Sequence, residues 1–100
     1  MPKSEFCIMP ESPYYGVERF PRSHRHEVFF GNGKRELSIK YGLVVFLTPE
    51  LHNMSGAGVH YNRDFDLLIK RIGQRAAMDY YSWTVKDFIA VFGKNYLEGE

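Results

Sequence analysis

A chain of 100 residues with a net charge of +1 is long enough for one small domain with a thin core, and too short for two. Its 44% apolar and 25% charged content is that of an ordinary globular protein, and no apolar run approaches the length that spans a bilayer. The single cysteine, Cys7, excludes an internal disulfide and a zinc site built from cysteines. We expect a reducing, cytoplasmic environment without membrane contact, because the N-terminus also lacks the pattern of a signal peptide.

The first third of the chain predicts an arm that leads into a strand. Residues 1–22 hold four of the five prolines and show no apolar period, which is typical of an extended arm or an irregular cover. Residues 25–30 read as a short strand, and the glycines at 31 and 33 break it.

A short helix and a second strand are expected next. Residues 34–40 predict one or two helical turns that bury Leu37 and stop at Gly42. Residues 43–47 are continuously bulky, and Pro49 ends the run. A continuous apolar run of this length suits a strand that is covered on both faces.

The second half of the chain predicts helices. Thr48 and Pro49 suit the cap and first turn of a short helix that carries His52. The strongest helical pattern covers residues 62–81, with Asp66 and Lys70 at a favourable spacing of four. Apolar residues at spacings of three and four form its buried stripe: Phe65, Leu68, Ile69, Ile72 and Ala76.

A last helix is predicted to begin at Thr84, where Asp87 completes an approximate capping box, and to end at Gly93. Its expected buried stripe consists of Val85, Phe88, Ile89 and Phe92. Two strands followed by packed helices define an α+β domain over residues 23–100, preceded by the arm 1–22.

Four histidines are grouped by this predicted topology. His24 and His26 head the first strand, while His52 and His60 follow the second. If the strands pair antiparallel, the start of the first meets the end of the second, and all four imidazoles fall near one end of the hairpin. Imidazoles grouped in this way can bind a divalent transition metal, and one left uncoordinated can act as a general base.

The charge distribution adds a phosphate-binding element. Between Arg19 and Lys40 there are six cations against two acids. A local basic stretch can contact nucleic-acid phosphates even when the whole chain is nearly neutral. The residues that we expect to make these contacts are Arg25, Lys34, Arg35 and Lys40.

The stretch "RHEVFFGNGKRELSIKYGLVVFLTPELHNMSGAGVHYNRDFDLLIKRIGQRAAM", together with the closing "FGKNYL", resembles a family of small phage and prophage proteins of the HNH-nuclease type. The resemblance runs from about Arg25 to Leu97. It implies a ββα-metal (HNH-like) hairpin with a short helix, followed by two packed C-terminal helices. It also implies a metal-dependent endonuclease or nickase that hydrolyses DNA inside a bacterial host cell, with Zn²⁺, Mg²⁺ or Mn²⁺ as the ion.

Carried over to this chain, the family pattern places His26 near the general-base position. His52 and His60 match the metal-binding histidines, and Glu27 or His24 would complete the shell. The family's structural zinc knuckle is missing, because its cysteine pairs are absent here. The asparagine that orients the base in HNH enzymes is replaced by Gly42, so Asn53 or Asn62 would have to take that role.

These departures keep two other interpretations open. One is a catalytically degenerate HNH scaffold that binds nucleic acid or a phage protein without cleavage. The other is a structural protein that forms a homodimer or larger oligomer through aromatic residues such as Tyr61 and Trp83.

Overall fold

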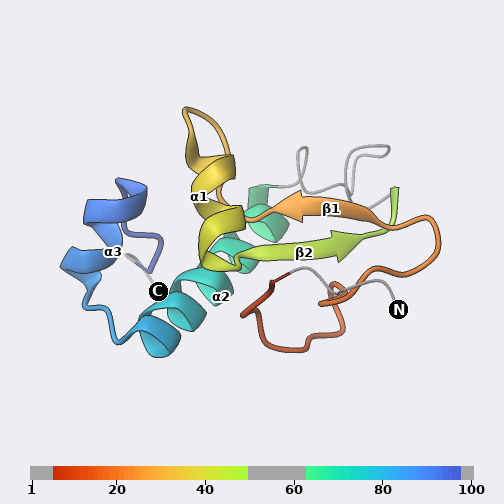
Figure 1. The fold of residues 1–100 in the computed structure, drawn as a ribbon, viewed down its shortest axis with the longest axis horizontal. Helices are drawn as coiled ribbons and strands as arrows, with labels where there is room; N and C mark the ends of the chain where they lie inside the picture. The colour runs from red at the N-terminus through yellow and green to blue at the C-terminus, as the bar shows by residue number, and fades with distance from the viewer. Residues whose placement is uncertain (1–5, 50–62, 98–100) are drawn as a thin grey trace.

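Two short strands pair antiparallel in the middle of the molecule (Figure 1). The protein is represented by a computed structural model, which describes residues 6–49 and 63–97. Strand β1 covers His24–Glu27 and β2 covers Val44–Leu47, with His24 opposite Leu47 and Glu27 opposite Val44. The start of the first strand therefore lies beside the end of the second, which confirms the predicted hairpin register.

Strand β1 is shorter than the predicted range 25–30, and Ser38 is the reason. The Val28 N–H still donates to the Leu43 carbonyl at 2.9 Å, but Phe29 bonds to a side chain instead of a strand. Its N–H donates to Ser38 Oγ at 3.0 Å, and its carbonyl accepts from the same hydroxyl at 2.7 Å. One buried hydroxyl thus replaces a partner strand at this position.

Helix α1, Lys34–Tyr41, lies between the strands in the chain and ends at Gly42, as predicted. Gly42 adopts φ 78°, a left-handed conformation that glycine takes without strain and that commonly closes a helix. The prediction that Leu37 is the buried residue of this helix is wrong. Ser38 is fully buried, because its hydroxyl bonds to Phe29, whereas Leu37 is half-buried at the edge of the core.

Helix α2 covers Arg63–Tyr81, which confirms the helix predicted over residues 62–81 for the part that the structure describes. Its most buried positions are Ile69, Gly73, Gln74 and Ala77, so the buried face is shifted from the predicted stripe. Gly73 explains the shift, because a Cβ there would lie 3.0 Å from Val28 and 3.3 Å from the Phe29 ring. The missing side chain lets the helix axis approach Val28 and Phe29, just after β1.

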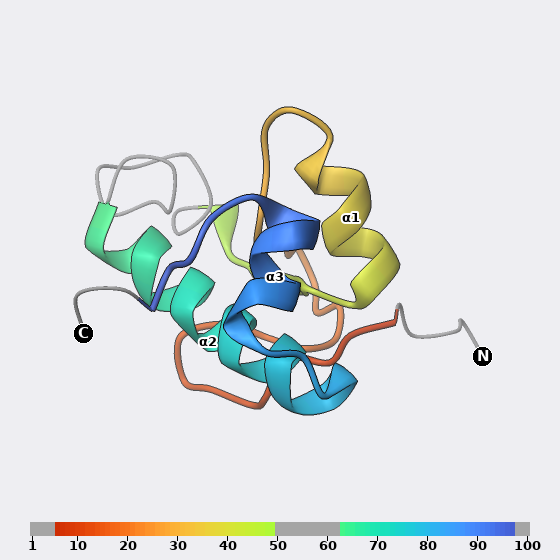
Figure 2. The same cartoon turned by 90° about the vertical axis from the view of Figure 1, so that its left-hand side faces the viewer.

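Helix α3, Val85–Phe92, lies beside α1 and α2 at one end of the molecule (Figures 1 and 2). The predicted capping box is confirmed, with Thr84 Oγ1 accepting from the Asp87 N–H and Asp87 accepting from the Thr84 N–H. Phe88 and Phe92 are buried as expected, but Ile89 is 38% exposed, because no described element covers that side of the helix. The observed α+β class agrees with the prediction.

The chain after α3 is fixed to α2 through Gln74, which is fully buried. Its Nε2 donates to Asn95 Oδ1 at 2.8 Å, and its Oε1 accepts from the Tyr96 N–H at 2.7 Å. Burial of an amide is tolerated when its donors and acceptor are bonded in this way. Tyr96 is thereby placed against the Phe29 ring, with 5.2 Å between ring centroids.

The N-terminal residues that the structure describes lie along β2. The Gly16 N–H and carbonyl both bond to Phe46, each at 2.8 Å, and the Ile8 N–H donates to the Gly42 carbonyl. Met9 and Tyr15 are buried against the core, and the Tyr15 hydroxyl donates to the Pro10 carbonyl at 2.6 Å. Residues 8–16 therefore run along the edge of β2 that does not pair with β1.

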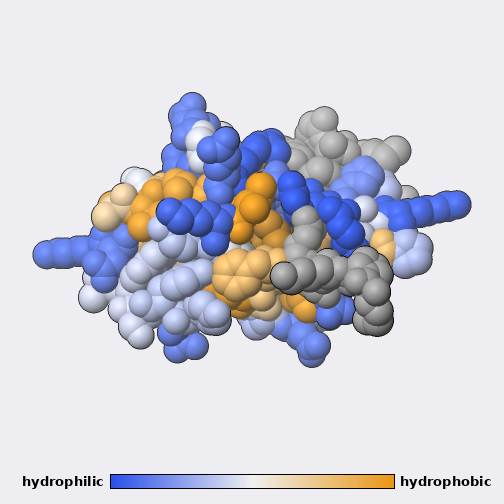
Figure 3. Space-filling view, in the orientation of Figure 1, coloured by the Kyte–Doolittle hydropathy of each residue, from blue (hydrophilic) through white to orange (hydrophobic). Residues whose placement is uncertain are grey.

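Several large apolar or aromatic side chains remain on the surface, and Figure 3 shows apolar surface in the middle of one face between hydrophilic side chains. The most exposed of these side chains are Phe6, Tyr14, Phe20, Ile39, Tyr80 and Ile89.

Within the described ranges, none of the helices combines the length and the apolar content that crossing a bilayer requires.

Replacement of Ser38 by alanine is expected to destabilise the fold by about 2–4 kcal/mol, because both backbone groups of Phe29 would then be buried without a partner. Urea denaturation measures the loss. Ser12→Ala is the matched control, since Ser12 Oγ accepts from the Tyr14 N–H at an exposed site. It should cost less than about 0.5 kcal/mol. Equal effects of the two changes would contradict the role given to Ser38.

Tyr15 is expected to make stability depend on pH in the alkaline range. Burial raises the pKa of Tyr15 from 10.0 to about 12, with a smaller contribution from the nearby Cys7 thiol. The folded state then keeps a proton that the unfolded chain loses, so this stabilisation is complete below pH 10 and declines as pH rises to about 12. Urea denaturation should find Tyr15→Phe less stable than wild type below pH 10, with the difference closing above it. A constant difference would show that the phenol does not titrate in this way.

Candidate functional site

A buried carboxylate holds two arginines at the junction of β1 and α1. Glu27 is 8% exposed; its Oε2 accepts from Arg25 Nε at 3.0 Å and its Oε1 accepts from Arg35 Nη1 at 3.1 Å. The arginine side chains are themselves 34% and 59% exposed. Two guanidinium groups are thus oriented by one carboxylate and still reach solvent, which leaves a net positive charge at this surface.

The next part of the site is built around Phe30, which is half-buried just after β1. Lys70 Nζ lies 4.3 Å from the centroid of the Phe30 ring, and Arg35 Cζ lies 5.8 Å from it. The His26 ring packs edge-on against the same phenyl ring at 5.7 Å. Cations over an aromatic face are stabilised by the ring quadrupole, so Phe30 brings residues from β1, α1 and α2 to one place.

Lys70 also forms an ion pair with Asp66 one helical turn earlier. Its Nζ lies 2.8 Å from Asp66 Oδ2, and the two side chains are only 13% and 17% exposed. Within the described part of the chain, Asp66 Oδ1 is buried and has no hydrogen-bond partner. Burial raises the pKa of the neighbouring Tyr96, and the Asp66 charge adds to the effect, which keeps that hydroxyl protonated.

The two described histidines lie on β1 in different environments. His26 is 2% exposed and opposite Val45, whereas His24 is exposed at the start of the strand. Side chains alternate along a strand, so His24 and His26 share one face while Arg25 and Glu27 share the other. Glu27 could bind a metal only if both arginines were displaced from its oxygens, and it would approach from the opposite face to His26.

The remaining predicted site residues divide into two groups. Lys34, Arg35 and Lys40 are all on α1, where Arg35 and Lys40 are exposed and Lys34 is half-buried. The predicted ligands His52 and His60, and the predicted orienting residues Asn53 and Asn62, lie outside the described residues. Among residues 6–49 and 63–97, no group of three or more histidine, cysteine or acidic side chains is close enough to hold a metal ion.

Comparisons with known proteins do not assign this chain to a family. No protein-family model matches the sequence, and neither a curated protein nor a solved structure matches it significantly.

Sequence reasoning identified Arg25 and Arg35 but missed the role of Phe30 and the participation of Lys70. The spacing of Asp66 and Lys70 was visible in the sequence as a helical ion pair. That this pair packs on Phe30 depends on how α2 crosses the hairpin, which local patterns do not encode.

Glu27→Gln is expected to destabilise the protein by roughly 1–3 kcal/mol, because a neutral amide cannot satisfy two guanidinium groups. The lower part of this range is expected, since both arginines reach water. Glu36→Gln on the exposed side of α1 removes the same charge and is the control. Thermal unfolding of the two variants compares them, and a Glu36 effect as large as that of Glu27 would refute the pairing.

Proposed function

We propose that this chain is a DNA-binding module of the HNH-like ββα-metal type that nicks or cleaves DNA with a divalent metal ion. Support comes from the hairpin register, which puts the histidine-bearing start of β1 beside the end of β2. The chain then passes through the segment that contains His52 and His60 before α2 packs against Val28 and Phe29, just after β1. This order of strand, strand and helix is the one that the family resemblance implies.

Binding of the DNA backbone is the best-supported part of the proposal. Arg25 and Arg35 are held by Glu27 with their guanidinium groups partly in solvent, so little side-chain entropy is lost when they contact a phosphate. Lys34 and Lys40 extend the same charge along α1. These contacts would position a duplex without reading its sequence.

For cleavage, His26 is the proposed general base, which takes a proton from the attacking water. His52 and His60 are the proposed metal ligands, with His24 as a further donor from the same face of β1 as His26. A bound divalent ion would stabilise charge on the phosphate and leaving oxygen. In this proposal Glu27 orients the two arginines and is not a ligand.

A second candidate is a scaffold that binds nucleic acid without cutting it. Two observations favour it: His26 is 2% exposed, and both oxygens of Glu27 are bonded to arginines. A general base needs contact with water or substrate. This candidate keeps the phosphate-binding surface and dispenses with the metal, or binds a phage protein instead.

Phosphate binding is tested by measuring duplex affinity against salt concentration for Arg35→Gln and Arg25→Gln. Each change should weaken binding for every sequence and lower the salt slope by about 1. Arg75→Gln is the control, because Arg75 lies in a different pocket with Ile8 and Tyr80. If the control weakens binding equally, the effect is one of net charge and not of this surface.

Cleavage is tested on supercoiled plasmid with Mg²⁺, Mn²⁺ or Zn²⁺ and with a chelator. His26→Gln should lower the nicking rate by about 10²–10⁴-fold while leaving duplex affinity within twofold of wild type. Circular dichroism confirms that the variant is folded. Nicking that survives the change removes His26 from the mechanism, and salt-dependent binding without nicking under any metal selects the scaffold.

A further inference from the structure

An apolar pocket lies at the end of β2, and its wall residue Phe46 pairs with Arg25 of the proposed DNA-binding face. Its volume is about 290 Å³, close to the lower end of the roughly 300–1,000 Å³ range of small-ligand pockets. This size suits a single ring system. The walls combine the N-terminal segment with the strand and consist of Pro13, Tyr14, Tyr15, Gly16, Phe20, Phe46, Leu47 and Thr48.

Two aromatic rings of this pocket are open to solvent, and one of them, Phe20, is held in place by its surroundings. Tyr14 is 50% exposed and Phe20 is 38% exposed. The Phe20 N–H donates to Ser23 Oγ at 3.1 Å, and the Ser23 N–H donates back to the Phe20 carbonyl at 2.9 Å. A Cβ at Gly16 would lie 3.0 Å from the Phe20 ring, so the ring rests directly on the backbone.

One cation lies against a wall of this pocket, and two others lie nearby in the sequence. The exposed Arg19 has its guanidinium 5.2 Å from the centroid of Phe46, a wall of the pocket. Arg22 is exposed in the turn that follows Phe20, and Arg25 lies three residues further on. Because Glu27 is paired with Arg25, Arg19 and Arg22 stand against Glu18 in residues 18–27, which leaves an excess of one positive charge.

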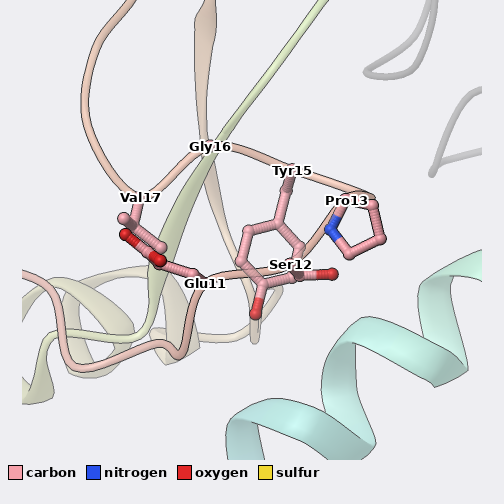
Figure 4. Close-up of a pocket in the computed structure, with 6 residues that line it drawn as sticks. All are labelled: Glu11, Ser12, Pro13, Tyr15, Gly16 and Val17. Atoms are coloured by element: carbon pink, nitrogen blue, oxygen red, sulfur yellow. The ribbon is translucent and has the colours of Figure 1, made fainter.

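Two other pockets lack this combination of open rings and excess positive charge. A pocket of about 530 Å³ shares Pro13, Tyr15 and Gly16, but Figure 4 shows the Glu11 carboxylate beside Val17 in its wall. A pocket of about 420 Å³ between Ile8 and α2 is lined by both Arg75 and Asp79. Among these three pockets of the described residues, the pocket at the end of β2 is therefore the best fit for an aromatic ligand attached to an anionic chain.

We infer that this pocket binds one unstacked base of a single-stranded nucleic acid, with Tyr14 and Phe20 contacting the base and Arg19 and Arg22 the flanking phosphates. The inference rests on the proposed function in that the ligand is a nucleic acid. It adds a substrate class, namely a strand with at least one unpaired base. Stacking on aromatic rings tolerates any base, so this pocket is expected to be insensitive to sequence.

The test uses the full chain with a chelator present, so that no cleavage occurs, and fluorescence anisotropy of labelled oligonucleotides. The probes are single-stranded DNA, RNA of the same sequence, and the blunt DNA duplex. Phe20→Ala should weaken single-strand binding by roughly 5- to 100-fold, as expected for one lost stacking contact, while duplex affinity changes less than twofold. Phe20→Tyr should restore the single-strand affinity.

Tyr80→Ala is the matched control, because Tyr80 is 60% exposed and lies in the separate pocket with Ile8. The comparison of the DNA and RNA strands identifies the sugar that is preferred. The inference would be overturned if Phe20→Ala weakened single-strand and duplex binding equally, or weakened neither. It would also be overturned if Phe20→Ala changed the sedimentation of the protein and not its affinity for DNA, because the pocket would then be a protein interface. Failure of nicking alone leaves single-strand binding intact, so the two proposals fail separately.

Discussion

The hydroxyl of Ser38 is the constraint on which the rest of this small fold depends. It is fully buried and bonds to both backbone groups of Phe29, at 3.0 and 2.7 Å, while the Ser38 carbonyl accepts from Leu43 at the start of the second strand. Ser38 thereby connects α1 to Phe29, just after β1, and to Leu43, just before β2. Arg35 lies three residues before Ser38, on the same face of the helix, so fixing Ser38 under Phe29 also places Arg35 over Glu27.

The same residue, Phe29, transmits this constraint to the C-terminal half. Its ring packs at 5.3 Å from Phe88 and 4.7 Å from Phe92, and α2 approaches it at Gly73. Gln74, the next residue, bonds to the Tyr96 N–H. Lys70, one turn earlier, lies between the rings of Phe30 and Tyr96, so the position of α2 is set by polar and aromatic contacts together.

The parts of the fold that sequence predicts well are those determined by local chemistry. Thr84 and Asp87 form the expected capping box, and Gly42 and Gly93 end their helices in left-handed conformations. The errors arise where burial depends on a distant partner. Leu37 was expected inside in place of Ser38, which is buried only because Phe29 offers both a donor and an acceptor.

In the candidate site, too, the features set by local sequence were predicted and those set by distant contacts were not. Arg25 and Arg35 were predicted as phosphate contacts from charge alone, and both are found at the surface. Glu27 was predicted as a metal ligand because the family resemblance has a metal-binding residue beside the general base; here both Glu27 oxygens are bonded to arginines. Its link to Arg35 spans eight residues across the Gly31–Gly33 loop, a contact that no periodic pattern encodes.

Electrostatics at Glu27 bear on the choice between cutting and binding. A buried carboxylate needs compensating positive charge, which either a metal ion or basic side chains can supply. Here Arg25 and Arg35 supply it, so the charge of Glu27 is compensated without an ion. A metal site that includes Glu27 would have to overcome both pairs and the repulsion of two nearby cations. In the proposed function the metal ligands are therefore the histidines, and the role of Glu27 is to orient the two arginines.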